Sequence, residues 1–221
     1  MLLKRLLKRY WFQIVLLLPL VVFVFGVTLV PLVGTVFLSF QHKFTHHFPT
    51  LQNYAALLTH FQFQEAVCNT LLITIFSLTL ELATAMGLAL LLAKRFIGRS
   101  LLRVVIILPL GVPTIVSAAN MRYFFDTHGF LNEVLFRLHL IAAPVNWMQA
   151  EAGTLFIIAL ADMWKVTPLV MLVLLAGLET IPQQLYEAAK VDGAGAIQVF
   201  RRITLPLLKP FIIMAVIIRG I

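Results

Sequence analysis

The sequence has a single cysteine and few charged residues. One cysteine cannot form an internal disulfide, so a small scaffold held together by disulfides is excluded. Charged residues make up 12% of the chain, against about 25% in ordinary soluble domains, which excludes a disordered chain and a coiled coil. What is abundant is apolar: 61% of the 221 residues are hydrophobic, and the mean hydropathy is +0.99. This composition indicates an integral membrane protein.

Four apolar runs are long enough to cross a bilayer, and a fifth begins where the sequence stops. A hydrocarbon core of about 30 Å needs about 20 apolar residues in a helix. The runs cover residues 11–40, 68–93, 104–125, 153–177 and 210–221. Backbone inside a bilayer must satisfy its own hydrogen bonds, so we predict an all-α, polytopic membrane domain over residues 1–221, with four complete spans and the start of a fifth. The last run provides only about 16 Å of helix, so we expect a truncated product, a fragment or an incomplete gene.

The net charge of +8 comes mainly from three basic clusters. They lie in residues 4–9, 94–103 and 190–209, and no odd number of spans separates one cluster from the next. Because lysine and arginine collect in cytoplasmic loops, the N-terminus is predicted to be cytoplasmic. Topology thus explains the charge, and we expect membrane lipid as a partner and no nucleic acid. In the loop on the outer side of the membrane, residues 51–58 predict a short amphipathic helix that lies on the membrane face.

The sequence lacks the motifs of common catalytic and metal sites. It contains no GxxxxGK[ST] loop, no HExxH pair and no GxSxG elbow. His42, His46 and His47 have roughly helical spacing, but solvated side chains in an outer loop explain them better than a metal site does. We therefore expect no enzyme activity, no bound metal and no cofactor held by this chain.

Ionisable residues inside the apolar runs are candidates for function, because burying a charge in a membrane is costly. They include Glu81 in the second run, and Asp162 and Lys165 in the fourth. Asp162 and Lys165 are three residues apart and can face each other on one side of a helix. Two interpretations stay open: a self-neutralising pair buried in the bundle, or a polar lining of a solute path. The same alternatives hold for Glu81.

The inner loop before the last run carries the most local signals. Pro182 suits a first helical turn, residues 183–191 contain good helix formers, and Gly193 lies where a helix end favours a left-handed residue. Residues 196–204 predict a second helix, which we expect to end at Leu205-Pro206. The residues alone favour equally a docking surface for a partner and a plain connector.

This inner loop covers residues 179–209. It contains residues in a defined spacing: Glu187-Ala188-Ala189, Gly193, Ile203 and Leu205-Pro206. The pattern resembles the EAA loop in the membrane subunits of bacterial binding-protein-dependent ABC importers. Further segments are similar to the carbohydrate-type branch of that family: residues 178–182, residues 186–194, Asn53-Tyr54, Asn69-Thr70, Leu108-Pro109 and Asp162-Met163-Trp164-Lys165. The resemblance implies the fold of a type I ABC importer permease and favours the docking surface over the connector.

The resemblance implies a function as well as a fold. The chain would be a permease subunit for a sugar or related polyol in the bacterial inner membrane. Two cytoplasmic ATPase subunits, which bind ATP and Mg, would be its partners, with a second permease subunit and an extracytoplasmic solute-binding protein. The implied ATPase-coupling interface comprises Tyr186, Glu187, Ala188, Ala189, Asp192, Gly193, Ala194, Ile203, Leu205 and Pro206. The alternatives are an ion-coupled secondary transporter and a non-transporting remnant.

Within that interface the resemblance implies distinct roles. Glu187 would be a charged contact to the ATPase, and Ala188 and Ala189 would permit close packing. Gly193 would let the chain turn sharply beneath the partner, although a plain helix cap explains the same glycine.

Overall fold

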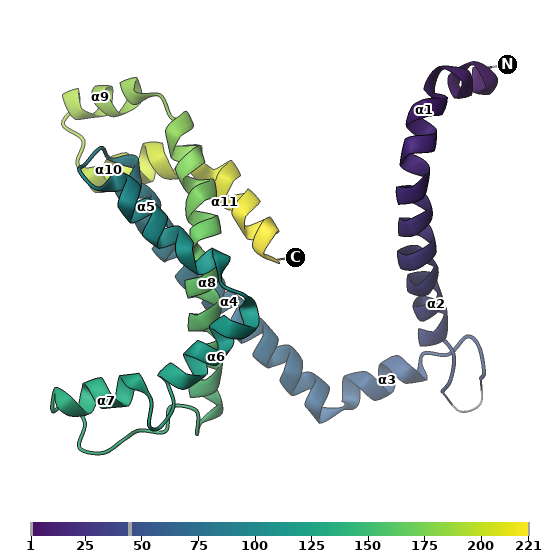
Figure 1. The fold of residues 1–221 in the computed structure, drawn as a ribbon, viewed down its shortest axis with the longest axis horizontal. Coiled ribbons are helices and arrows are strands. Elements are labelled where there is room, and N and C mark those ends of the chain that lie inside the picture. The colour runs from purple at the N-terminus through teal and green to yellow at the C-terminus, as the bar shows by residue number, and fades with distance from the viewer. Residues whose placement is uncertain (1, 44–45, 221) are drawn as a thin grey trace. The chain divides into compact units, whose positions relative to one another are not determined.

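Helices make up the computed structural model, which describes residues 2–43 and 46–220 (Figure 1). No strand occurs within these ranges. The chain divides into two compact units, Met1–Val67 and Cys68–Ile221. Four described helices are long and apolar enough to cross a membrane, and one bent helix pair could provide a further span. The predicted all-α, polytopic membrane fold is confirmed.

The first unit contains one long apolar helix. It consists of α1 (Leu2–Phe23), a π-helical turn η1 (Val24–Leu29) and α2 (Val30–Ser39). Pro31 near the start of α2 has no N–H for the carbonyl four residues earlier, and its ring crowds that carbonyl. A widened turn before the proline accommodates both effects, so the helix continues through it.

A short helix, α3 (Gln52–Thr59), confirms the predicted helix at 51–58. The Asn53 side-chain amide donates to the carbonyl oxygens of Ser39 at 3.0 Å and Gln41 at 2.7 Å. The hydroxyls of Tyr54 and Ser39 lie 2.6 Å apart. The amide contacts satisfy the carbonyl of Ser39, the last residue of α2, and that of Gln41 just beyond it, and together with the hydroxyl contact they attach α3 to this end of α2.

The second unit is built around α4, α8 and α11. Its helical elements are α4 (Phe61–Ala93, which begins in the first unit), α5 (Arg99–Ile107), η2 (Leu108–Gly111), α6 (Thr114–Phe124), α7 (Phe130–Arg137), α8 (Glu151–Thr180), α9 (Gln183–Val191), α10 (Ala196–Val199), η3 (Phe200–Thr204) and α11 (Leu205–Gly220). Helices α7 and α9 lie at opposite ends of α8 (Figure 1). The apolar core joins Ala85 and Ala89 of α4 to Met171 and Leu174 of α8 and Leu208 of α11.

The third predicted span is broken at a proline. The segments Arg99–Gly111 and Thr114–Phe124 meet at an angle of 100°. Val112 between them is extended, with φ −80° and ψ 130°, as Pro113 favours for the residue before it. The predicted span over residues 104–125 therefore corresponds to this bent pair, which is a broken span or a re-entrant loop.

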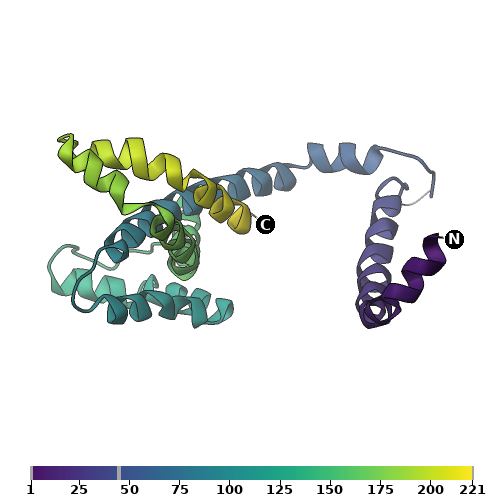
Figure 2. The same ribbon diagram turned by 90° about the horizontal axis from the view of Figure 1, so that it is seen from above.

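The last helix is longer than expected. Elements α10, η3 and α11 form one continuous helix over Ala196–Gly220, and α11 packs beside α8 (Figure 2). The predicted helix end at Leu205-Pro206 is wrong. Pro206 cannot donate to the carbonyl four residues earlier, but the preceding turn, Phe200–Thr204, widens into a π-helical turn and carries the chain past the proline.

Candidate coupling segment and ion cluster

Helix α9 ends in the predicted glycine turn. Gly193 has a φ of +73°, in the left-handed region. Its N–H donates to the Lys190 carbonyl at 3.2 Å, and the Ala194 N–H donates to the Ala189 carbonyl at 2.9 Å. This is the bonding pattern of a Schellman motif, which closes a helix and reverses the chain. A Cβ added at Gly193 would meet no atom within 4 Å, so backbone conformation and not space favours glycine here.

The residues of the predicted interface fall into outward-facing and inward-facing groups. The outward-facing residues are Glu187, Ala188, Asp192, Gly193, Leu205 and Pro206. Tyr186, Ala194 and Ile203 are half-buried. Ala189 is buried, with 8% of its surface exposed, so its close packing is with this chain itself and not with a partner. Only Ala188 of the two alanines presents a small, open surface.

One polar contact joins α9 to the final helix. The Tyr186 hydroxyl lies 3.2 Å from the Thr204 hydroxyl, which is buried in the π-helical turn η3. The structure therefore brings the two halves of the predicted interface, residues 186–194 and 203–206, together around this contact. We call residues 182–206 the coupling segment.

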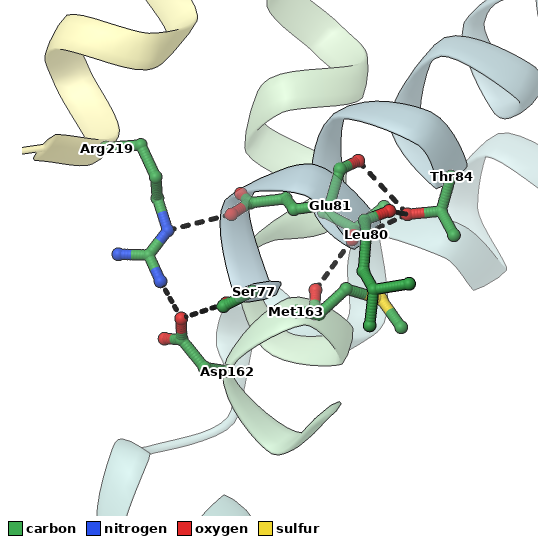
Figure 3. Close-up of polar contacts among 8 residues, drawn as sticks. Ser77, Leu80, Glu81, Thr84, Asp162, Met163 and Arg219 are labelled. Atoms are coloured by element: carbon green, nitrogen blue, oxygen red, sulfur yellow. Dashed lines mark hydrogen bonds and ion pairs between the residues drawn. The ribbon is translucent and has the colours of Figure 1, made fainter. Parts of the chain in front are cut away.

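Charged side chains meet where α4, α8 and α11 converge (Figure 3). The Arg219 Nε of α11 donates to Glu81 Oε2 of α4 at 2.9 Å, and the Arg219 Nη2 donates to Asp162 Oδ2 of α8. The Ser77 hydroxyl of α4 donates to the same Asp162 oxygen at 2.6 Å. We call these four residues the ion cluster. It connects three helices through one guanidinium group.

Hydrogen bonding at Glu81 is incomplete. The residue is fully buried, and burying an ionised carboxylate requires a partner. Arg219 bonds only one of its oxygens; Glu81 Oε1 is buried and has no hydrogen-bond partner within the described residues. Arginine binds a carboxylate most strongly through two parallel N–H bonds to both oxygens. Here the Nε and Nη2 donors are instead divided between two carboxylates.

Lys165 does not pair with Asp162. Its Nζ donates to the Thr114 hydroxyl of α6, while Asp162 bonds Arg219 and Ser77. The interpretation of a self-neutralising Asp162–Lys165 pair is therefore wrong in the described part of the chain. Each side chain finds its partner on another helix, because Arg219 and Thr114 are within reach. The interpretation as a polar lining of a solute path stays a prediction.

A cavity of about 330 Å³ lies between α6 and α8. Its wall is mostly apolar and includes Ile157 and Met121. The polar groups come from Thr114, Ser117, Arg122, Asp162 and Lys165, among others. An apolar cavity with a few convergent polar groups is typical of small-molecule sites. Asp162 belongs both to this wall and to the ion cluster.

Sequence reasoning passed over three of the residues that organise this region. Arg219 carried a usable signal: it is an ionisable residue in an apolar run, and two carboxylates in other runs need a cation. Ser77 and Thr114 are small hydroxyl residues in apolar runs, which occur commonly without any role in a site. Their partners become visible only when helices far apart in sequence are placed together.

Comparison with known proteins identifies a family. The sequence model of the family described as binding-protein-dependent transport system inner membrane component matches residues 83–221. The matched range includes Asp162, the coupling segment and Arg219.

Individual relatives agree with that match. The trehalose/maltose transport system permease protein MalF of Thermococcus litoralis is 39% identical over 210 residues, covering 93% of this chain and 70% of MalF. The sulfoquinovosyl glycerol transport system permease protein SmoG of Agrobacterium fabrum is 37% identical over 185 residues, covering 83% of this chain and 59% of SmoG. A crystal structure of a bacterial ABC transporter that imports the acidic polysaccharide alginate matches with a TM-score of 0.85 and 26% identity, over 99% of this chain and 75% of that one.

Proposed function

The chain belongs to the family of binding-protein-dependent transport system inner membrane components, and we propose that it is a permease subunit of an ATP-driven sugar importer. In this role it forms part of the path along which a sugar or related polyol crosses the membrane. The coupling segment receives the movement of a separate ATPase and passes it to the membrane helices.

The geometry of the coupling segment is the observation that supports the proposal most strongly. Glu187 and Ala188 are exposed on α9, and the left-handed Gly193 reverses the chain into the final helix. An exposed, short helix anchored by a tight turn can enter a groove on a partner. The Tyr186–Thr204 contact fastens it to the helix that continues to Gly220, so a push on α9 reaches the membrane helices.

The partners follow from the kind of system. Two cytoplasmic ATPase subunits hold ATP and Mg, since this sequence has no phosphate-binding loop of its own. A second permease subunit completes the path, and an extracytoplasmic binding protein delivers the solute. The basic clusters at residues 94–103 and 190–209 support the proposal that the coupling segment and the N-terminus lie on the cytoplasmic side.

The cavity between α6 and α8 is the proposed solute path. MalF, SmoG and the alginate transporter are named for trehalose and maltose, sulfoquinovosyl glycerol and alginate, which are carbohydrates or their derivatives. Hydroxyl-rich solutes need hydrogen-bonding groups against an apolar wall. Asp162, Lys165 and Thr114 provide such groups here.

A co-purification experiment tests this function. The chain is expressed with a tagged ATPase subunit of its transport system, and each is recovered through the other. Valine in place of Gly193 is disfavoured, because a β-branched residue is strained at a φ of +73°. Gly193→Val and Glu187→Lys are each expected to reduce recovery of the complex by about fivefold or more.

Matched controls separate the interface from general damage. Gly87 of α4 lies outside the coupling segment, and a Cβ added there meets no atom within 4 Å, so Gly87→Val should leave recovery unchanged. Glu133→Lys makes the same charge change on α7, whose glutamate is also exposed. Recovery at the wild-type level for both Gly193→Val and Glu187→Lys would overturn the coupling role.

A further inference from the structure

The C-terminal part of the coupling segment and Arg219 of the ion cluster lie on one continuous helix. The helix Ala196–Gly220 is 25 residues long, which corresponds to about 38 Å at 1.5 Å per residue. Its first turns belong to the coupling segment, and Arg219 lies at the other end. A helix transmits displacement along its axis because its backbone hydrogen bonds resist stretching. A movement imposed near Thr204 therefore reaches Arg219.

The final helix approaches α8 very closely. A Cβ added at Gly177 of α8 would lie 2.5 Å from Cγ of the Phe211 ring and 2.8 Å from Leu208 Cδ2. Leu208 and Ala215 are buried in the same contact. Close packing favours discrete arrangements over continuous deformation. Arg219 thus sits at the end of a rigid helix that has a limited set of positions against α8.

The ion cluster has a second bonding arrangement available. Arg219 Nε and Nη2 point to the same side of the guanidinium and can both bond one carboxylate. If both turned to Glu81, the unpartnered Oε1 would gain a donor and the burial of Glu81 would be fully compensated. Asp162 would then lose Arg219 but keep the Ser77 hydroxyl. Its carboxylate, which lines the cavity, would become available to a bound molecule.

We propose that Arg219 is a positioning residue for transport: it holds Asp162 in the arrangement described here and, when the final helix moves, transfers both donors to Glu81 and releases the Asp162 carboxylate to the solute cavity. The ion cluster is the two-state element, and the helix from Ala196 to Gly220 is the lever that switches it. This inference rests on the proposed function, because the lever is moved by the ATPase.

The experiment follows the Asp162 carboxylate directly. The transporter, assembled with its ATPases and second permease subunit, is treated with a hydrophobic carbodiimide, which labels carboxyl groups that no ion pair protects. Labelling is compared by mass spectrometry without nucleotide and with nucleotide trapped on the ATPases. Labelling of Asp162 is expected to rise by about fivefold or more in the trapped state. Glu81 is expected to stay protected in both.

A double variant distinguishes positioning from simple stabilisation. Arg219→Gln alone leaves Glu81 buried without a cation and is expected to fold poorly. Arg219→Gln combined with Glu81→Gln removes both charges, so the complex should assemble again, as size-exclusion chromatography would show. In this double variant Asp162 should be labelled equally in both nucleotide states. Lys209→Gln removes an exposed charge from the same helix and should keep the wild-type difference.

The outcomes separate this inference from the proposed function. If the wild-type chain does not assemble with the ATPases, the proposed function fails, and the inference fails with it. If the complex assembles but the labelling of Asp162 is the same with and without trapped nucleotide, only the inference fails. A nucleotide-dependent difference that persists in the double variant would also overturn it, since Arg219 would then not control Asp162.

Discussion

Two arginine–glutamate pairs of the second unit have similar lengths and very different surroundings. Arg99 Nη2 lies 3.2 Å from Glu179 Oε1, and the two side chains are 31% and 59% exposed. Arg219 Nε lies 2.9 Å from Glu81 Oε2, and Glu81 is not exposed at all. Water can replace a partner in the first pair, whereas the buried carboxylate of the second depends on its guanidinium. The distances alone therefore barely separate these pairs, and burial decides what each contributes to stability.

The largest predicted effect comes from breaking the buried pair. Arg219→Met leaves a buried carboxylate without its cation, and the expected loss of stability is about 3–5 kcal/mol. Thermal unfolding of the purified chain in detergent measures it. Combining Arg219→Met with Glu81→Gln should recover most of the loss in the midpoint temperature of unfolding. A single variant with an unchanged midpoint would show that Glu81 does not need Arg219.

A smaller effect is expected where the final helix meets α8. Gly177→Ala places a methyl group against the Phe211 ring and Leu208, and overpacking of this kind costs about 1–3 kcal/mol. Gly87→Ala is the matched control, because a Cβ at this helical glycine of α4 meets nothing within 4 Å. The same unfolding measurement should separate the two. Equal midpoints would contradict the tight contact between α8 and α11.

The smallest effect is expected at the exposed pair. Glu179→Gln should change stability by less than about 1 kcal/mol, because water solvates Arg99 once the pair is lost. Unfolding midpoints at low and high salt measure this change. As salt screens the pair, the midpoint of the wild-type protein should approach that of the variant. A loss as large as that of Arg219→Met would erase the contrast between the two pairs.

The sequence predicted the local features well. Continuous apolar runs identify membrane helices without any knowledge of packing, and the Asn53 region showed its short helix through local periodicity. Gly193 was predicted in the left-handed region because helix ends favour glycine there. Such features depend on neighbours within a few residues.

The errors occurred where helices respond to prolines or to each other. Pro113 lies at a bend of 100°, whereas the helix continues past Pro206 through a π-helical turn. The residues alone do not distinguish these results. A pair between Asp162 and Lys165 was one of two open interpretations, but Asp162 bonds Arg219, 57 positions away. Sequence spacing describes one helix at a time, so a partner on another helix stays hidden.

The most direct test of the account is a photo-crosslink from α9. A photoreactive amino acid replaces Glu187 in the assembled transporter, and the same amino acid replaces Glu133 of α7 in a parallel sample. The account predicts a covalent adduct with the ATPase from position 187 and none from position 133. An adduct from position 187 with the binding protein, or with this chain's own helices alone, would contradict the coupling segment.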